Sequence, residues 1–429
     1  MVAIIRRVSV KELISSGEAE LKTGPFGTQL KASEYTEEGT PVINVRNIGF
    51  GTIKADKLEF IPPATRDRLS SHLLRPGDIV FGRKGAVERH VFIRLDQDGW
   101  FQGSDCLRLR FNSPRVEPLF ASYFFLTEEH QRWMQNQCSH GATMSSLNQG
   151  ILERIELPLP PFPVQQRMAG ILSAYDELIE NSHRRIRILE TMARALYREW
   201  FVNFRFPGHE TLRCVASPLG PIPQGWDIKQ LKDVCVEPNG IQTGPFGSQL
   251  HEADYSDDGI PVVMPKNLIG FRVETQGIAR IPEHTAERLS RHRMQPDDIV
   301  YGRRGDIGRR AYLMPYQTGW LCGTGCLRIR PNIRAANSWY LFNYLGEDAA
   351  QSVIAGRAQG VTMPNLSTAM LVSVPVKMPP RRLQDEFARL TLPMAQAREV
   401  LTAKIEKLRS TRDLLLPRLL SGQINLETN

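Results

Sequence analysis

The chain contains one block of sequence twice, 220 residues apart. Residues 23–30 read TGPFGTQL, and residues 243–250 read TGPFGSQL. About 35 of 88 paired positions are identical between residues 23–110 and residues 243–330. A unit of about 150 residues that occurs twice is a duplicated domain, because stacked repeat proteins have periods of roughly 20–50 residues. With 429 residues, the chain is long enough for each copy to bury a core of its own.

Each copy mixes strand-like runs with glycine-rich turns. The run GDIVFG at residues 77–82 leads into GRKG at residues 82–85, and a helical stretch, LFASYFFLTEEHQRWM, follows the last strand-like run. The block GATMSSLN at residues 141–148 matches GVTMPNLS at residues 360–367. The predicted fold class is α+β, with a small mixed sheet and helices in each of the two copies.

A proline-rich step follows each copy, LPLPPFP and then VPVKMPP, and the chain then becomes helical. Apolar residues recur there at alternating spacings of four and three, the period of a coiled-coil seam. Two helices of roughly 40 residues, each about 60 Å long, would pair antiparallel and separate the copies in a pseudo-twofold arrangement. The alternative is that each stripe packs on its own domain. The seam positions are Met168, Leu172, Tyr175, Ile179, Ser182, Ile186, Leu189, Ala193, Leu196 and Trp200, then Phe387, Leu390, Met394, Ala397, Leu401, Lys404, Leu408, Thr411 and Leu415.

Pro393 interrupts the second helical pattern. It predicts a kink or a late start there, because proline lacks the amide donor and disfavours helical geometry at Leu392. The predicted segments are a first domain at 1–160, a central helical region at 161–205, a connector at 206–225, a second domain at 226–380 and a C-terminal helical region at 381–429.

Composition excludes several classes of protein. No apolar run approaches the roughly 18 residues that a membrane-spanning helix needs, and the N-terminus lacks the apolar segment of a signal peptide. We therefore expect a cytoplasmic protein without a membrane partner, whose six cysteines are reduced. Cys322 and Cys326 lack the further ligands of a zinc site. The net charge of +8 and the pI near 9.2 favour a polyanionic partner such as nucleic acid.

Catalytic motifs are missing. The stretch LPPF at 159–162 resembles the Asn-Pro-Pro-aromatic signature of amino-methyltransferases, but Leu159 cannot accept a hydrogen bond from a base. Neither a glycine-rich cofactor loop nor a GxxxxGK[ST] phosphate loop occurs. Asp78 and Asp298 recur in both copies, each directly before an apolar strand, which predicts a turn or capping role rather than a metal site. We predict no catalytic, cofactor-binding or metal-binding residue.

Hydrogen-bond donors do recur. GRKG at 82–85 and GRRG at 302–305 place two cations between glycines, where the backbone can approach a phosphate. Other recurring blocks supply hydroxyls and amides, which suit phosphates or base edges. A solvated run of charge is the alternative. The predicted DNA contacts are Gln29, Arg46, Asn47, Arg83, Lys84, Arg89, Thr143 and Ser145 in the first copy, and Gln249, Lys266, Asn267, Arg303, Arg304, Arg309, Arg310, Thr362 and Asn365 in the second.

The two copies differ sharply between their shared blocks. Residues 49–60 and residues 269–280 have no identical residue at any paired position. Shared blocks with variable segments indicate one platform that reads two different targets. The glycines of both TGPFG turns are interpreted as backbone geometry, and Phe26 and Phe246 as anchors into each core. His72 and His292 recur without a catalytic partner and are interpreted as structural or phosphate-facing.

These blocks resemble the specificity subunits of type I restriction-modification systems. The similarity rests on TGPFGSQL, DIVYGRRG, GVTMPNLS, the helix end ALYREWFVNF and the C-terminal LLLPRLLSGQI. It covers nearly the whole chain, although the first copy lacks the IPQGW entry found before the second. The resemblance implies two target recognition domains that read an asymmetric bipartite site in double-stranded DNA, with the helices setting the gap between its halves.

The resemblance also implies a division of labour. Two methylation subunits would bind the helices and methylate adenine with S-adenosylmethionine, and two restriction subunits would add ATP- and Mg-dependent cleavage. The chain itself would bind no cofactor and would not be an enzyme on its own. Two rivals are a self-contained DNA-modification enzyme with unrecognised catalytic motifs, and a bivalent protein-binding scaffold, which leaves the paired basic loops unexplained.

Overall fold

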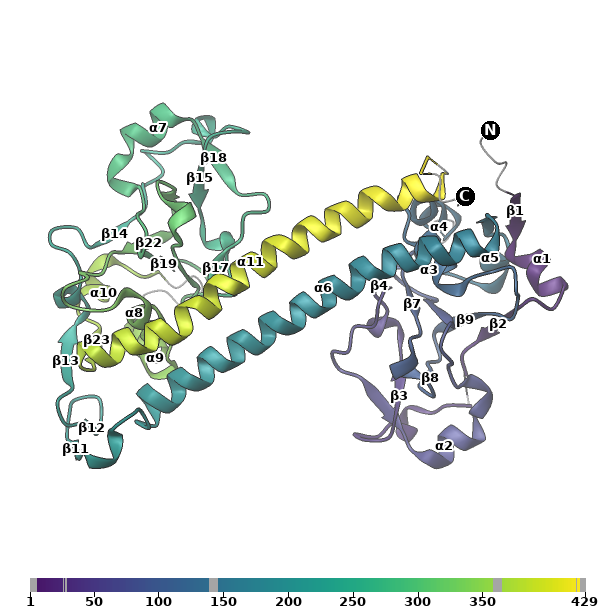
Figure 1. Ribbon diagram of the computed structural model, residues 1–429, viewed down its shortest axis with the longest axis horizontal. Coiled ribbons are helices and arrows are strands. Elements are labelled where there is room, and N and C mark those ends of the chain that lie inside the picture. Colours follow the sequence, from purple (N-terminus) through teal and green to yellow (C-terminus); the bar gives the residue numbers. More distant parts are fainter. Residues whose placement is uncertain are drawn as a thin grey trace. The chain divides into compact units, whose positions relative to one another are not determined.

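The computed structural model describes residues 6–25, 27, 29–138, 146–357, 365–421 and 423–424. The chain divides into two compact units, Met1–Arg184 with Leu401–Asn429, and Arg185–Val400. Each unit contains one copy of the repeat and one end of each of two long helices (Figure 1). Both are built from small sheets and helices, so the predicted α+β class is confirmed.

The first unit contains a five-stranded and a three-stranded sheet. The five-stranded sheet has the order β2 (Ala19–Thr23), β9 (Cys106–Phe111), β6 (Ile79–Gly82), β7 (His90–Phe92) and β4 (Phe50–Gly51). The three-stranded sheet has the order β5 (Glu59–Ile61), β3 (Thr40–Ile43) and β8 (Phe101–Gln102), and β1 (Arg6–Ser9) pairs with β10 (Glu156–Leu159). The short helices are α1 (Val10–Ser15), α2 (Pro63–Arg68), α3 (Pro118–Phe125), α4 (Glu128–Cys138) and α5 (Gln149–Glu153).

The second unit repeats this plan. Its four-stranded sheet has the order β14 (Ile241–Thr243), β22 (Cys326–Ile329), β19 (Ile299–Gly302) and β20 (Arg310–Tyr312). Its three-stranded sheet has the order β18 (Ala279–Ile281), β15 (Ile260–Val263) and β21 (Leu321–Cys322). Two-stranded pairs are β13 (Asp227–Gln230) with β23 (Pro375–Met378), β11 (Cys214–Val215) with β12 (Ile222–Pro223), and β16 (Leu268–Ile269) with β17 (Arg272–Val273). The short helices are α7 (Glu283–Arg288), α8 (Ser338–Tyr344), α9 (Asp348–Arg357) and α10 (Thr368–Val372).

The central strands β6 and β19 are buried on both faces. Because strand side chains alternate, Ile299 and Tyr301 enter the core that contains α8, whereas Val300 enters a separate core on the opposite face. Ile79 and Phe81 are divided from Val80 in the same way in the first unit. Continuous apolar runs such as DIVF and DIVY are what a strand covered on both faces requires.

Asp78 and Asp298 close the same turn in the two units, as the sequence predicted. The carboxylate of Asp298 accepts the Gln295 amide at 2.7 Å and a two-point contact from Arg330 at 2.8 and 2.7 Å. Asp78 accepts the Arg75 amide at 2.8 Å and the Arg110 guanidinium at 2.6 and 2.7 Å. Each carboxylate therefore links the turn before the central strand to the end of the neighbouring strand, β9 in the first unit and β22 in the second.

The recurrent histidines are structural rather than phosphate-facing. His72 and His292 are both buried, and His292 Nδ1 lies 3.0 Å from the Thr243 carbonyl oxygen. Burial, reinforced by neighbouring cations, lowers the pKa of each ring to about 4. Both rings are therefore uncharged near neutral pH and unsuited to attracting a phosphate.

Two long helices run through both units. Helix α6 (Phe162–Tyr197) continues into a π-helical turn at Arg198–Val202, and α11 spans Arg381–Leu420. In the first unit Asp176 of α6 pairs with Arg412 of α11 at 2.5 Å, and in the second Glu190 pairs with Arg398 at 3.7 Å. Each unit thus joins opposite ends of the two helices, which makes them antiparallel.

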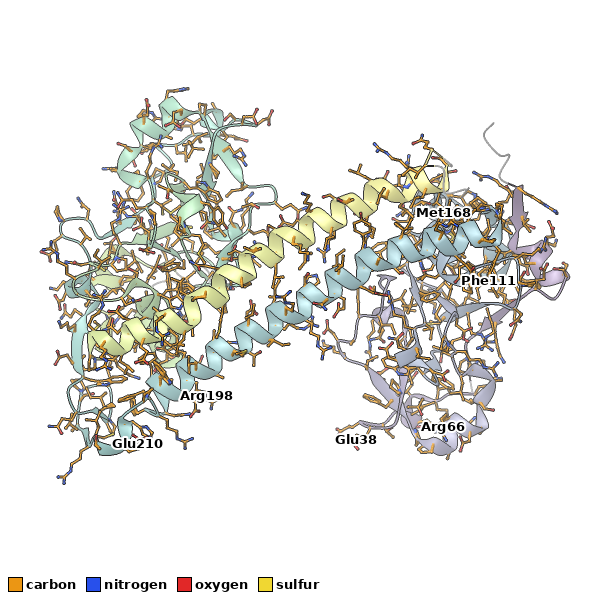
Figure 2. The ribbon with its side chains drawn as sticks, in the orientation of Figure 1. Glu38, Arg66, Phe111, Met168, Arg198 and Glu210 are labelled. Carbon is orange, nitrogen blue, oxygen red and sulfur yellow. The ribbon has the colours of Figure 1, made fainter. Side chains whose placement is uncertain are left out.

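The helix ends are fixed by apolar packing within each unit. Met168 of α6 lies in the first unit (Figure 2). It packs there together with Leu172 of α6, Phe120 of α3 and Leu419 of α11. In the second unit, the core that holds Phe387 of α11 extends to the end of α6. That core also includes Tyr197, Trp200, Phe201, Trp226 and Tyr340.

The burial pattern agrees with the predicted seam in the first long helix and contradicts part of it in the second. None of the ten seam positions from Met168 to Trp200 is exposed. In α11, the predicted seam residues Ala397 and Lys404 are exposed, and Arg398 and Ile405, one position later, are buried instead. The predicted late start is also wrong, because α11 is helical from Arg381 through Pro393. In the part of the chain that the structure describes, no helix is both long and apolar enough to cross a membrane.

Candidate nucleic-acid interface

Four recurring segments meet at one end of the sheet in the second unit. The Arg303 amide donates to the Gly325 carbonyl at 2.9 Å, and the Leu366 amide donates to the Arg303 carbonyl at 2.8 Å. The Thr324 hydroxyl donates to the Pro245 carbonyl at 2.9 Å. Residues 243–247, 302–305, 323–325 and 365–367 therefore form one surface, which we call the second loop cluster.

The first unit holds an equivalent surface. The Arg83 amide donates to the Asp105 carbonyl at 2.8 Å, and the Leu147 amide donates to the Arg83 carbonyl at 2.8 Å. Gln149 Nε2 donates to the Thr23 hydroxyl at 3.0 Å. We call the described residues among 23–27, 82–85, 103–105 and 146–149 the first loop cluster. Blocks that recur far apart in the sequence thus converge at the same place in both units.

Gly244 is required for space rather than for backbone conformation. A Cβ atom at Gly244 would lie 2.0 Å from the Gly323 carbonyl oxygen, and one at Gly24 would lie 1.9 Å from the Gly103 carbonyl oxygen. A Cβ at Gly247, in the same turn as Gly244, would meet nothing within 4 Å. The close approach of two backbones explains why the turn keeps its first glycine in both copies.

Gly244→Ala is expected to lower the free energy of unfolding of the second unit by about 1–3 kcal/mol, the usual cost of overpacking. The backbone atoms that the new methyl meets cannot rotate away. Gly247→Ala is the matched control and should change that free energy by less than about 0.5 kcal/mol. Hydrogen exchange followed by mass spectrometry of peptides from the second unit measures both, and equal effects would show that the contact with Gly323 does not govern this turn.

The second loop cluster carries less opposing charge than the first. Arg304 is exposed, and Arg303 is half-buried with Nη2 3.3 Å from Asn365 Oδ1. In the first cluster, the ammonium of Lys84 lies 3.4 Å from the carboxylate of Asp105. Gly325 occupies the position of Asp105 in the second copy, so the cations there have no such carboxylate.

The other predicted contacts lie outside the loop clusters as defined. Arg46 is half-exposed and pairs with Glu59 at 2.7 Å, whereas Lys266 is exposed. Arg89 lies over the ring of Phe50, 5.2 Å from its centroid. Arg309 is largely exposed and pairs with Asp306 at 2.8 Å; Gln29 is exposed; Gln249 uses its side-chain oxygen to accept the Phe246 amide at 3.2 Å. Thr143, Ser145 and Thr362 fall outside the described residues.

The structure contradicts Asn47 and Asn267 as DNA contacts. Asn267 is buried, accepts the Met264 amide at 3.0 Å and donates to the Glu274 carbonyl at 3.3 Å. Asn47 accepts the Asn44 amide at 3.1 Å and donates to the Lys54 carbonyl at 3.0 Å. Both amides are occupied in holding the start of the divergent segment. In the sequence, this capping role is indicated by an asparagine that lies three residues after the residue whose amide it accepts.

Arg310 and Phe246 also differ from their predicted roles. Arg310 is only 7% exposed, so its guanidinium cannot reach a groove of DNA. Phe246 was predicted to anchor in the core but is 54% exposed. Phe26, its counterpart, lies outside the described residues. The sequence carries one signal for Arg310, since the aligned position in the first copy is His90, which is also buried.

Cys322 and Cys326 lie in the core of the second unit. Burial raises the pKa of the Cys322 thiol to about 12. Within the described ranges, no group of three or more His, Cys, Asp or Glu side chains is placed to hold a metal ion.

Comparisons with known proteins indicate the family. The family model "Type I restriction modification DNA specificity domain" matches residues 28–191. The type I restriction enzyme MjaIX specificity subunit of Methanocaldococcus jannaschii is 25% identical over 312 residues, covering 71% of this chain and 68% of that protein. These two matches support a type I specificity subunit. The putative MjaX specificity subunit of the same organism is 22% identical over 395 residues, covering 91% of this chain and 88% of that protein.

A solved structure shares the fold of this specificity subunit. The S subunit of a type I restriction-modification system from M. genitalium aligns over 96% of this chain and 95% of its own length, with a TM-score of 0.65 at 17% identity. The matched model describes a DNA specificity domain, and both relatives are specificity subunits of type I restriction enzymes. These findings support the resemblance seen in the sequence over the self-contained enzyme and the scaffold.

Proposed function

We propose that this specificity subunit reads an asymmetric bipartite site in double-stranded DNA, one half-site with each unit. The observation that carries the proposal is the pair of matching loop clusters, each beside a segment that differs between the copies. The shared clusters bring cations and short polar side chains to one end of each sheet, which suits phosphate contacts. Contacts of that kind position a protein without reading sequence.

The divergent segments suit base recognition. In the first unit, residues after Asn47 form β4, which adds to the edge of the sheet beside β7 in parallel. In the second unit, the corresponding residues form the β16–β17 hairpin, which does not pair with the sheet. Its Leu268–Val273 pair matches the isolated Ile48–Ile53 bridge of the first unit. Two units with the same anchoring surface and different side chains in the neighbouring segment would read different base sequences, so the two half-sites would differ.

The long helices would serve as both spacer and docking surface. Leu178, Ile188 and Met192 are exposed on α6, at 47%, 49% and 51%, which leaves apolar area for a partner. We propose that two methylation subunits bind the helical regions and that two restriction subunits join the full cytoplasmic complex. S-adenosylmethionine, ATP and Mg would then be bound by those partners, and none by this chain.

Replacing Arg303 and Arg304 together by alanine is expected to weaken DNA binding and to flatten its salt dependence. If each cation neutralises one phosphate, the slope of log K against log salt becomes less negative by about 1.8 for the pair. Fluorescence anisotropy of a labelled duplex, measured across a salt series with the assembled complex, gives the slope directly.

Lys229→Ala with Arg382→Ala is the matched control. Both residues are exposed, and neither belongs to an element of the loop cluster. The control removes the same net charge and should leave the salt slope nearly unchanged. An identical slope for Arg303→Ala with Arg304→Ala and for the unmodified chain would exclude these arginines as phosphate contacts. Methyl transfer by the purified chain alone would instead favour the self-contained enzyme.

A further inference from the structure

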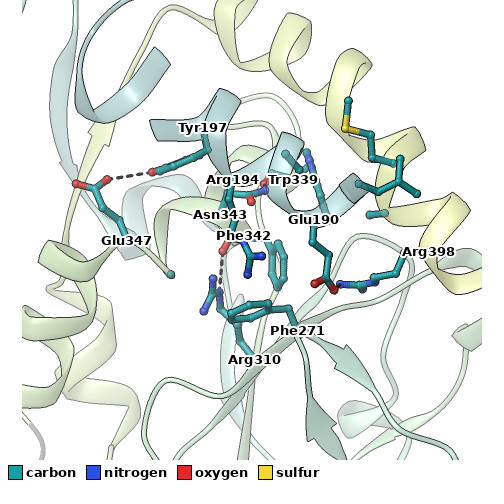
Figure 3. A pocket seen from close by; sticks show the side chains of 15 residues that line it. Glu190, Arg194, Tyr197, Phe271, Arg310, Trp339, Phe342, Asn343, Glu347 and Arg398 are labelled. Atoms are coloured by element: carbon teal, nitrogen blue, oxygen red, sulfur yellow. Dashed lines mark hydrogen bonds and ion pairs between the residues drawn. The ribbon is translucent and has the colours of Figure 1, made fainter. Parts of the chain in front are cut away.

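A partly open cavity of about 160 Å³ lies in the second unit (Figure 3), and none of its lining residues belongs to the second loop cluster. Its walls come from α6, α8, α11, β20 and the turn of the β16–β17 hairpin. The lining is mostly apolar, and Arg310 from β20 forms part of it. The lining residues used below are Leu189, Ala193, Phe342, Gly346, Met394 and Arg310.

Arg310 is a buried cation with no carboxylate partner among the described residues. Its Nε donates to the Phe342 carbonyl at 3.0 Å, and its Nη1 lies 3.4 Å from the Gly308 carbonyl. The rings of Phe271 and Phe342 lie 4.7 and 5.0 Å from the guanidinium carbon. Burial lowers the pKa of Arg310 to about 10, so it remains charged at neutral pH. A charge held in this way is costly unless an anion comes to it.

The backbone around Arg310 makes room for this side chain. A Cβ atom at Gly346 would lie 1.4 Å from Arg310 Nη2, although Gly346 does not have the left-handed conformation that would itself require glycine. In the first copy, the aligned residues are His90 and Thr127. His90 there is bonded to the Ser122 hydroxyl at 2.8 Å. The paired arginine and glycine thus belong to the second unit alone.

The acidic side chains around the cavity are already paired. Glu347 accepts the Tyr197 hydroxyl at 3.0 Å and pairs with Lys377 at 2.8 Å. Glu190 pairs with Arg398 at 3.7 Å. Figure 3 shows Arg310 lying apart from both carboxylates, beside the rings of Phe271 and Phe342. Arg194 also lines the cavity, but it is exposed to solvent. The cavity therefore offers one buried positive charge without a carboxylate partner, that of Arg310, and an apolar wall.

We infer that this cavity binds a small organic carboxylate, whose carboxylate pairs with Arg310 while its apolar body lies against Leu189, Phe342 and Met394. A planar guanidinium matches a carboxylate in geometry as well as charge. Apolar cavities of about 150 Å³ hold a benzene-sized molecule, which sets the size of the apolar body. A small inorganic anion would satisfy the charge and leave the apolar wall without a partner.

Calorimetric titration of the full chain with benzoate tests the inference without DNA or partner subunits. Benzoate should bind saturably at one site, and benzamide, which has the same shape without the charge, should bind about tenfold more weakly or worse. Inorganic phosphate should bind more weakly than benzoate. The absence of saturable benzoate binding, or equal affinity for benzamide, would overturn the assignment. If phosphate bound more tightly than benzoate, the proposal of an organic ligand would be wrong.

Two variants locate the site. Arg310→Met removes the charge and should abolish the difference between benzoate and benzamide. Ala193→Leu keeps Arg310 but fills the cavity, and it should weaken benzoate binding about tenfold or more, because no room remains for the ring. Ala195→Leu is the matched control on the same helix, since Ala195 is exposed and does not line the cavity. Equal losses for the two leucine variants would place the ligand elsewhere.

Discussion

Asp298→Ala is expected to lower the free energy of unfolding of the second unit by about 3–5 kcal/mol, the range found when one partner of a buried ion pair is removed. Asp298 is 1% exposed, and its partner Arg330 is 22% exposed. The substitution leaves the Arg330 guanidinium without its carboxylate. It also removes the acceptor that holds the Gln295 amide, so the turn before β19 loses its closure.

Three further variants separate this effect from a general loss of charge. Asp298→Asn keeps the shape and one acceptor, so it should cost less than Asp298→Ala and remain foldable for measurement. Asp306→Ala breaks the exposed pair with Arg309 and should cost less than about 1 kcal/mol. Asp78→Ala should repeat the large effect in the first unit, because the contacts of Asp78 are the same.

Hydrogen exchange followed by mass spectrometry measures these effects unit by unit, since peptides from β19 and from β6 report on different units. Denaturation of the whole chain would merge two transitions into one curve. Asp298→Ala and Asp306→Ala could lower the free energy of unfolding equally. The buried ion pair would then not stabilise the central sheet, and the capping role predicted for the recurrent aspartate would be wrong.

Much of the fold can be predicted from the sequence, because the repeat and the spacing of apolar residues both reflect which residues are buried. A strand buried on both faces must be apolar throughout, and DIVF and DIVY occur at the matching positions of both copies. The burial pattern of α6 also agrees with its predicted seam, because each seam position is packed or half-buried. Recurrence also identified GRRG and GVTMPNLS as sources of candidate DNA contacts. Their meeting through Arg303 and Leu366 depends on contacts far apart in sequence, which periodicity does not encode.

The failures have a common physical cause, since a polar side chain can be buried when the backbone satisfies it. Arg398 occupies a seam position of α11 and donates to the Gly270 carbonyl at 3.1 Å, so a pattern of apolar letters misplaced the seam by one residue. Asn267 and Arg310 were interpreted as surface donors for the same reason. Phe246 shows the converse, an aromatic ring beside glycines that remains exposed on a turn.

Exchanging residues 234–375 for the matching block of a relative is expected to change one half of the recognised DNA site completely and to leave the other half unaltered. The two junctions of this block lie together, because the Leu231 amide donates to the Val374 carbonyl at 2.8 Å. The exchanged block therefore enters and leaves at one place, beside the β13–β23 pair. Both long helices and the whole first copy remain those of the original chain.

One contact limits which relative can supply the exchanged block. The Tyr340 hydroxyl donates to the Lys377 carbonyl at 2.6 Å, and its ring packs against Phe201 at the end of α6, with ring centroids 4.8 Å apart. The incoming block must supply an aromatic residue at that position, or the second unit would lose its packing against the helix. With a block that meets this condition, the exchange tests DNA recognition and not the stability of the second unit.

The first unit offers the reciprocal exchange. The Val10 amide donates to the Ile155 carbonyl at 2.9 Å, so residues 13–156 also enter and leave the domain at one place. This exchange should change the other half-site only. Methylome sequencing of cells carrying each hybrid subunit with its methylation subunits measures both halves and the gap between them. Alteration of both half-sites by either exchange would contradict recognition by two independent heads, because the residues that differ between the copies would then act jointly on one sequence.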